Sequence, residues 1–543
     1  MTAIAAGARV AATSRTAGEF AGTGQMLRLY LRRDRVVAPL WSLLIGSMPA
    51  LQIVSMKDIY STGAQLDQFA ATTAASPALI AMYGPVFSSA LGSIGTWKAG
   101  AMYAMIAIAA VLTIIRHTRV EEETGRAELV GATSIGRFAG LTGAILLTFG
   151  ASAVAGITCV ASLMATGLPV AGSVAFGAAL TASGVMWGAV AAVTAQVSTG
   201  ARLARGIALG LLGAAFAVRA VGDAGNGVLS WFSPLGWCLQ IRPFADERWW
   251  VLLPSAALGA GATLIAYRLL RTRDIGAGLL ADRPGPAAAG AALTGPVGLA
   301  WRLQRGSLLA WTTGFALYGL LIGGAVNSIG GMLDDSGTMQ DVITSLGGSA
   351  DLEKSFIAYA VTMLAAAAAA YSVSAVLRLH DEENSGRAEP VLAAAVGRVR
   401  YASSHLLFAI AGPAVALLAA GLAIGIVWGA TEGDMASKLA HSVGAVAVQL
   451  PAVWVVTAIA MLLFGALPRY ASLAWGVLSA MIVIFLLGSL GTFPQWILDL
   501  VPFVHPPKLP GAPFDIAPVA YLSALAAAGI LLGLSAFRRR DLR

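Results

Sequence analysis

The sequence predicts an all-α integral membrane protein of about twelve transmembrane helices, arranged as two pseudo-symmetric halves of six. Of its 543 residues, 57% are hydrophobic and only 11% are charged, which excludes an ordinary soluble domain. Residues 138–201 contain no charged side chain. A membrane crossing takes about 20 apolar residues, so this stretch alone holds two successive spans. A charged segment also recurs at matching places in two very hydrophobic halves.

Twelve apolar runs mark the predicted spans. The first half places them at 36–54, 98–116, 138–165, 168–195, 206–222 and 250–270. The second half places them at 307–326, 357–377, 402–428, 442–465, 471–489 and 517–537. The predicted domains are a flexible cytoplasmic tail (1–23), the first six-span half (24–275), a cytoplasmic linker rich in glycine, alanine and proline (276–296), and the second six-span half (297–543).

Arginine-rich loops alternate with acid-rich loops along the chain. This distribution follows the positive-inside rule, so both termini are expected in the cytoplasm and the chain in the cytoplasmic membrane, as a multi-pass protein. The placement of the arginines also argues against a nucleic-acid partner, which a net charge of +8 would otherwise suggest. Each half begins with an amphipathic, arginine-bearing stretch, Leu27–Arg33 and Trp301–Arg305. Both stretches are expected to lie along the inner membrane surface.

The charged segment spans residues 121–137 in the first half and 382–398 in the second, and ten of its seventeen positions are identical. In each copy, a glutamate pair precedes a glycine that can end a helix in the left-handed conformation. Arg-Ala-Glu then starts a short helix, and an arginine marks the return to the bilayer. The shared residues are Glu121, Glu122, Gly125, Arg126, Glu128 and Arg137, and Glu382, Glu383, Gly386, Arg387, Glu389 and Arg398. Pro390 replaces Leu129, in a first helical turn that tolerates proline.

This motif, E-E-x-x-G-x-x-E followed by apolar residues and an arginine, closely resembles that of the permeases of type-2 ABC exporters. The fused twelve-span form is similar to the tetronasin-type polyketide-antibiotic and multidrug exporters within that family. The resemblance implies that the twelve shared residues form two coupling helices, which contact two copies of a cytoplasmic ABC ATPase subunit. The alternative, two solvated loops whose charges only fix topology, explains the arginines but not the repeated residue order.

The expected energy source is a partner protein. The sequence has no GxxxxGK[ST] motif, so the chain is expected to be a transport subunit rather than an enzyme, with ATP and Mg²⁺ bound by the partner. No cofactor or metal is expected in the chain itself. Its five histidines are scattered, and its two cysteines, Cys159 and Cys238, are far apart in the sequence.

The shortage of polar side chains within the predicted spans suits a lipophilic small molecule as substrate, with membrane lipids around the protein. The resemblance implies a path between the halves. Candidate residues on this path are Met102, Met105, Phe216, Met363 and Trp475, although ordinary helix or lipid packing explains each of them equally well. Arg219 is the main charged residue inside a predicted span, and it is expected to extend to the outer interface.

These observations favour the permease subunit of an ATP-driven ABC exporter of hydrophobic drugs or antibiotics across the cytoplasmic membrane. Two other classes stay open. A membrane-embedded lipid-modifying enzyme would use the glutamates of the repeated segments as catalytic carboxylates, but two similar copies suit a pair of docking sites better. An ion-coupled secondary transporter is disfavoured, because such proteins keep ionisable groups near the middle of the membrane.

Overall fold

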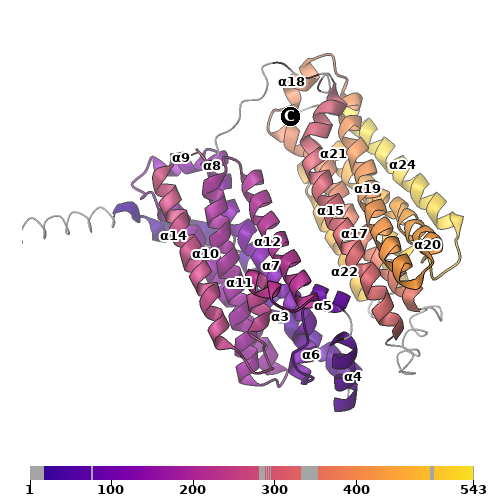
Figure 1. Cartoon of the computed structure of the whole chain (residues 1–543). Coiled ribbons are helices and arrows are strands. Elements are labelled where there is room, and N and C mark those ends of the chain that lie inside the picture. Colours follow the sequence, from indigo (N-terminus) through magenta and orange to yellow (C-terminus); the bar gives the residue numbers. More distant parts are fainter. Residues whose placement is uncertain are drawn as a thin grey trace, which may run out of the picture. The chain divides into compact units, whose positions relative to one another are not determined.

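A computed structural model describes residues 18–541 apart from 61, 75–76, 275, 280–287, 289, 291–292, 294, 332–351 and 489–493. Every regular element in this part of the chain is a helix, which confirms the predicted all-α fold (Figure 1). The helices form two compact units, Met1–Pro284 and Gly285–Arg543. Most of the predicted tail (1–23), and part of the predicted linker (276–296), lies outside the described residues.

Six long helices of the first unit correspond to its six predicted spans. They are α3 (Val37–Ile59), α7 (Ala101–His117), α10 (Ala139–Ala165), α11 (Val170–Val197), α12 (Ala201–Ala224) and α14 (Leu252–Thr272). Shorter elements precede or connect them: α2 (Thr23–Arg33), α4 (Gly63–Ala74), α5 (Pro77–Tyr83), α6 (Leu91–Trp97), η1 (Lys98–Gly100), α8 (Arg119–Glu123), α9 (Arg126–Gly131), η2 (Leu229–Phe232), α13 (Pro234–Gln240) and η3 (Trp249–Val251).

The second unit repeats this plan. Its spans are α15 (Pro296–Gly331), α17 (Leu352–Asn384), α19 (Arg398–Glu432), α20 with α21 (Met435–Ala447, Leu450–Ala466), α22 (Leu473–Gly488) and α24 (Ile516–Arg539). Its short elements are α18 (Ala388–Ala393), η5 (Pro468–Tyr470), α23 (Gln495–Leu498) and η6 (Pro502–Val504). Eleven helices of the described chain are long and apolar enough to cross a membrane. The one predicted span outside these eleven is 471–489, which corresponds to α22; this helix is apolar but shorter and borders undescribed residues.

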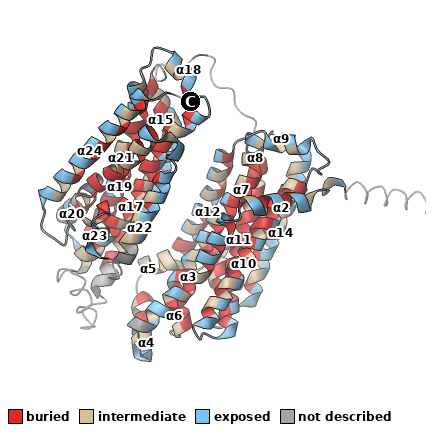
Figure 2. Ribbon diagram, turned by 180° about the vertical axis from the view of Figure 1, so that it is seen from behind, coloured by how far each residue is buried: buried red, intermediate tan, exposed pale blue. Residues whose placement is uncertain are grey.

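Buried residues gather on the central helices α11 and α17, whereas few residues of α12, α14 and α24 are buried (Figure 2). Small residues permit the close packing in each unit. A Cβ added to Gly156 of α10 would lie 2.6 Å from the carbonyl oxygen of Gly177 in α11. A Cβ on Gly533 of α24 would lie 2.8 Å from the carbonyl oxygen of Met461 in α21. Glycine at these points lets two helix backbones touch.

The two units differ at their amino-terminal ends. Leu27–Arg33 belongs to a separate amphipathic helix, α2, which buries Met26 and Tyr30 and ends at Asp34. In contrast, Trp301–Arg305 lies inside the continuous helix α15. The expectation of a separate surface helix at the start of each half is therefore wrong for the second half, because no turn separates this stretch from the span that follows.

Candidate functional site

Each repeated segment forms a short helix that follows a left-handed glycine. Gly125 has φ 71° and precedes α9, and Gly386 has φ 69° and ends the turn before α18. A Cβ on either glycine would meet nothing within 4 Å, so these positions need glycine for its backbone conformation and not for lack of space. The predicted helix stops are confirmed, and Pro390 lies in the first turn of α18 as expected.

The second glutamate of each motif binds the arginine that follows the last helix of its own unit. Glu122 accepts hydrogen bonds from Arg273 at 2.5 and 2.8 Å, and Glu383 accepts two from Arg540 at 2.5 and 2.7 Å. Such bidentate, charge-assisted pairs are among the strongest side-chain interactions. All four side chains are largely buried. We call these two pairs the glutamate–arginine clamps.

The arginine at the end of each motif reinforces its clamp through the backbone. Arg137 donates to the carbonyl oxygens of Leu270 at 3.1 Å and Arg273 at 2.5 Å. Arg398 donates to the carbonyl oxygen of Arg540 at 2.7 Å. A guanidinium is favourable at the carboxyl end of a helix, where carbonyl groups lack helical partners. In both units, therefore, the start of the third span is fixed to the end of the sixth.

The first glutamate of the motif is used differently in the two units. Glu121 pairs with Arg33 of α2 at 2.8 Å. Glu382 instead pairs with Arg378 at 3.0 Å and Arg387 at 2.8 Å, both close to it in sequence. Consequently the motif of the first unit is tied to its amphipathic helix, whereas the corresponding glutamate of the second unit is satisfied locally.

The remaining motif residues face outward. Glu128 and Leu129 of α9 are exposed, Leu129 by 74%. Glu389 and Pro390 occupy the matching places on α18 and are exposed as well. Within the described chain, neither glutamate makes a hydrogen bond or an ion pair. Each motif therefore divides into inward residues that bind its own unit and outward residues that are available to a partner.

A buried acid that was not predicted from the sequence lies beside the first motif. Asp34, between α2 and α3, is 1% exposed and lies 2.8 Å from His117 Nε2 and 3.0 Å from Arg116. Burial alone would raise the pKa of Asp34, but the hydrogen bond to His117 and the nearby positive charges hold that pKa below its ordinary value. No motif marks these residues, because Asp34 meets His117 and Arg116, at the end of α7, only in the folded bundle.

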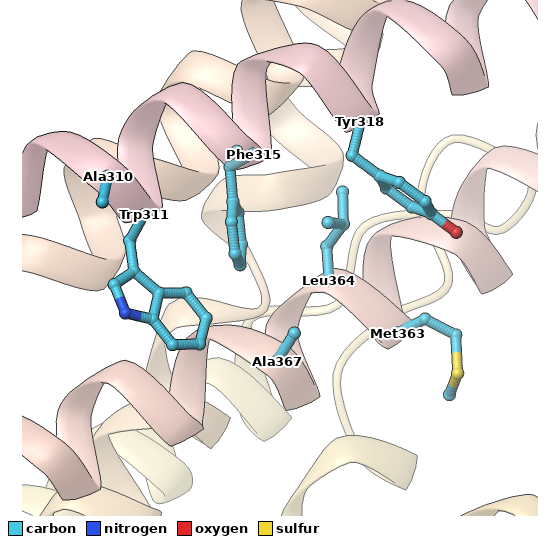
Figure 3. A pocket seen from close by; sticks show the side chains of 8 residues that line it. Ala310, Trp311, Phe315, Tyr318, Met363, Leu364 and Ala367 are labelled. Carbon is cyan, nitrogen blue, oxygen red and sulfur yellow. The ribbon is translucent and has the colours of Figure 1, made fainter. Parts of the chain in front are cut away.

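The predicted substrate-path residues fall in different surroundings. Met363 lines a cavity of about 470 Å³ between α15 and α17, in which Trp311 and Phe315 project towards Leu364 and Ala367 and Tyr318 lies on the side of Met363 (Figure 3). The other four predicted residues do not line this cavity. Met105 and Trp475 are exposed on their own units, Met102 is partly buried, and Phe216 lies against the guanidinium of a neighbouring arginine.

That arginine is Arg219, and its expected extension to the outer interface is wrong. The side chain is enclosed, with the residue 3% exposed. It pairs with Asp223 at 3.1 Å and donates to the carbonyl oxygens of Ala81 at 2.8 Å and Met82 at 3.0 Å. Asp223 in turn accepts a hydrogen bond from Ser230 at 2.5 Å. Because α5 and η2 fold over the end of α12, the guanidinium is satisfied inside the protein.

Comparison with known proteins agrees with a transport role. Residues 293–538 match the family model described as the C-terminal domain of multidrug efflux system permease Rv1217c. The multidrug efflux system permease protein Rv1217c of Mycobacterium tuberculosis (strain ATCC 25618 / H37Rv) is 53% identical over 525 residues, which cover 96% of each chain. With its many membrane-spanning helices, the chain therefore belongs to the family of the multidrug efflux system permease Rv1217c, as a multi-pass permease of the cell membrane.

Proposed function

We propose that this permease is the transmembrane subunit of a type-2 ABC exporter, which moves hydrophobic drugs or antibiotics out across the cytoplasmic membrane. Two copies of a separate ATPase subunit supply the energy. The observation that carries this proposal is the repeated short helix, α9 in the first unit and α18 in the second. Each unit exposes the glutamate of this helix and holds the preceding part of the motif through a glutamate–arginine clamp. The chain itself lacks a phosphate-binding GxxxxGK[ST] loop.

The exposed tips suit docking on a partner. Glu128 and Leu129 combine a carboxylate with an apolar side chain, and Glu389 and Pro390 repeat this combination. A carboxylate without an internal partner can pair with a basic residue of an ATPase cleft, while the apolar neighbour is buried on contact. Leu129 and Pro390 differ in shape, so the two docking contacts are similar but not equivalent.

The glutamate–arginine clamps give the docked helices a mechanical connection to the membrane. A displacement of α9 is passed to α8 and from there to the end of α14 through Glu122 and Arg273. A displacement of α18 is passed to the end of α17 and from there to the end of α24 through Glu383 and Arg540. Charge-assisted, mostly buried hydrogen bonds resist separation better than exposed ion pairs. Closure of the ATPase dimer would therefore move whole spans and not only surface loops.

The cargo is proposed to be lipophilic. The cavity between α15 and α17 is lined by apolar and aromatic side chains (Figure 3), a lining that favours flat apolar molecules. The similar protein from Mycobacterium tuberculosis is named a multidrug efflux permease, which supports a broad range of substrates. Trp311, Phe315 and Tyr318 supply the aromatic surface of this cavity.

The test is drug efflux from cells that express the permease with an ABC ATPase encoded beside it. The variant Glu128→Ala, Leu129→Asp, Glu389→Ala is expected to reach the membrane normally and to lower efflux by about tenfold or more, because docking is lost. The control is Leu500→Asp, an exposed apolar residue near α23. Unchanged efflux in the triple variant, or ATP hydrolysis by the purified permease alone, would refute the proposal.

A further inference from the structure

A second cavity lies in the first unit, where α2, α9, the start of α10 and the end of α14 meet. Its volume is about 550 Å³. Apolar side chains from three of these helices form part of its wall, namely Met26, Leu29, Leu141 and Leu270. Since α10 begins at Ala139 and α14 ends at Thr272, the cavity lies at the level where the spans reach the membrane surface.

The charged part of the wall holds three arginines and three acids. Its two glutamates form the pairs Glu121–Arg33, Glu121–Arg126, Glu122–Arg119 and Glu122–Arg273. Of these arginines, Arg126 and Arg273 line the cavity, whereas Arg33 and Arg119 do not. Arg137 is the third arginine of the wall, and it donates its hydrogen bonds to backbone carbonyl oxygens. Asp274 is the third acid of the wall. Both glutamates already have arginine partners, whereas within the described chain no carboxylate lies closer than 3.7 Å to Arg126 and none pairs with Arg137, so these two guanidinium groups favour an anionic ligand.

Two polar atoms of the wall are buried without partners. His117 is 1% exposed, and its Nε2 lies against Asp34, but its Nδ1 has no hydrogen-bond partner. Glu121 binds Arg33 through Oε2, whereas its Oε1 is buried and unpaired. Both residues line the cavity. Buried polar atoms are normally satisfied, and hydroxyl groups of a ligand would satisfy both of these.

We propose that this cavity binds an anionic phospholipid whose headgroup carries hydroxyl groups. Arg126 and Arg137 hold the phosphate. Arg126 is half exposed and comes no closer than 3.7 Å to a carboxylate, and Arg137 has no carboxylate partner among the described residues, so both guanidinium groups can bind an anion. The headgroup hydroxyls bind His117 Nδ1 and Glu121 Oε1. An acyl chain lies against Leu29 and Leu141, which explains why a lipid is preferred over free phosphate.

The second unit serves as an internal comparison. At the position 261 residues after His117 it has Arg378, which binds Glu382 together with Arg387. Both oxygens of Glu382 are therefore paired, unlike those of Glu121. Glu382 thus lacks the unpaired oxygen that Glu121 has, and the lipid is expected at the first motif alone.

Binding is tested on the purified full-length chain with short-chain lipids, by native mass spectrometry and by the shift in melting temperature. Phosphatidylglycerol is expected to bind about tenfold more tightly than phosphatidylcholine, and phosphatidic acid, which lacks the headgroup hydroxyls, in between. Equal retention of phosphatidylglycerol and phosphatidylcholine would overturn the proposal. Phosphatidic acid binding as tightly as phosphatidylglycerol would overturn the role of the hydroxyls, and equally tight glycerol phosphate would indicate a free-phosphate site instead.

Variants identify the site. Arg126 is half exposed, and its contacts are a local hydrogen bond to Thr124 and a loose ion pair with Glu121. The Arg126→Gln chain is therefore expected to fold, yet to bind phosphatidylglycerol about five- to tenfold more weakly. Arg137→Gln is expected to weaken binding similarly. The matched control is Arg398→Gln in the second unit, which is expected to bind as the unaltered chain does. Unchanged lipid binding in the Arg126→Gln, Arg137→Gln double variant would contradict the assignment.

Discussion

Arg540 donates two hydrogen bonds to the carboxylate of Glu383, across 157 residues of sequence. Arg273 and Glu122 form the same pair across 151 residues of the first unit. Because this pairing recurs in both halves, the glutamates of each motif can be assigned two different roles. The second glutamate holds the motif on its own unit, and the third, Glu128 or Glu389, is exposed for a partner.

The first prediction concerns the clamp of the second unit. Glu383→Gln keeps the side-chain shape but removes the charge that pairs with Arg540, and both side chains are mostly buried. The free energy of unfolding is expected to fall by about 2–3 kcal/mol, as measured by denaturant titration in detergent micelles. The control Glu389→Gln is exposed and unpaired, and it is expected to change stability by no more than about 0.5 kcal/mol. Equal effects of the two variants would contradict the clamp.

The second prediction concerns the glycine before α18. Gly386→Ala places a Cβ on a residue with φ 69°, which is expected to cost about 1–2 kcal/mol of stability. Gly397→Ala is the matched control, since Gly397 has φ −65° and also has open space around it. Thermal unfolding of both variants measures the difference. A Gly386→Ala chain as stable as Gly397→Ala would show that the left-handed conformation is not required.

The third prediction tests the contact between α10 and α11. A Cβ on Gly156 would lie 2.6 Å from a backbone carbonyl oxygen of α11, so Gly156→Leu must push the two helices apart. A loss of about 2–3 kcal/mol is expected. Gly150, on the same helix, has nothing within 4 Å of an added Cβ, and Gly150→Leu is expected to be close to neutral. If both variants melt at the same temperature, the close approach does not contribute to stability.

The fourth prediction concerns pH. The pKa of Asp34 is lowered in the folded chain, so its ionised form contributes stability above the ordinary aspartate pKa of about 3.9. This contribution is lost as the pH falls through the lowered pKa. The stability difference between the unaltered chain and Asp34→Asn is therefore expected to stay constant from about pH 7 to 5, and to shrink below about pH 4. A difference that persists unchanged at lower pH would refute this role.

Much of the architecture could be predicted from local sequence. Apolar runs located the spans, because hydropathy and length alone decide whether a helix can cross a membrane. The short helices α9 and α18 could be predicted because glycine and the sequence Arg-Ala-Glu determine where a helix ends and begins within a few residues. Side-chain partners were beyond such reasoning. Glu122 and Glu383 find their arginines more than 150 residues away, so only the folded bundle shows which carboxylates turn inward.

Arg219 illustrates the same limit. Its place in a predicted span was correct, but its partners are carbonyl oxygens of residues 81 and 82, which are 138 and 137 residues earlier in the chain. An arginine near a helix end normally reaches water or lipid headgroups. Here a folded loop supplies the acceptors, and no local pattern around Arg219 predicts that loop.

The continuous helix α15 has a mechanical consequence. A straight helix bends sharply only where its backbone hydrogen bonds are interrupted, and α15 runs unbroken from Pro296 through the stretch that corresponds to α2. A force applied near Trp301 is therefore expected to move α15 as one rigid helix. The first half instead has a turn at Asp34, which His117 and Arg116 hold in place, so a force on α2 reaches α3 through this turn and its partners and not through one unbroken helix.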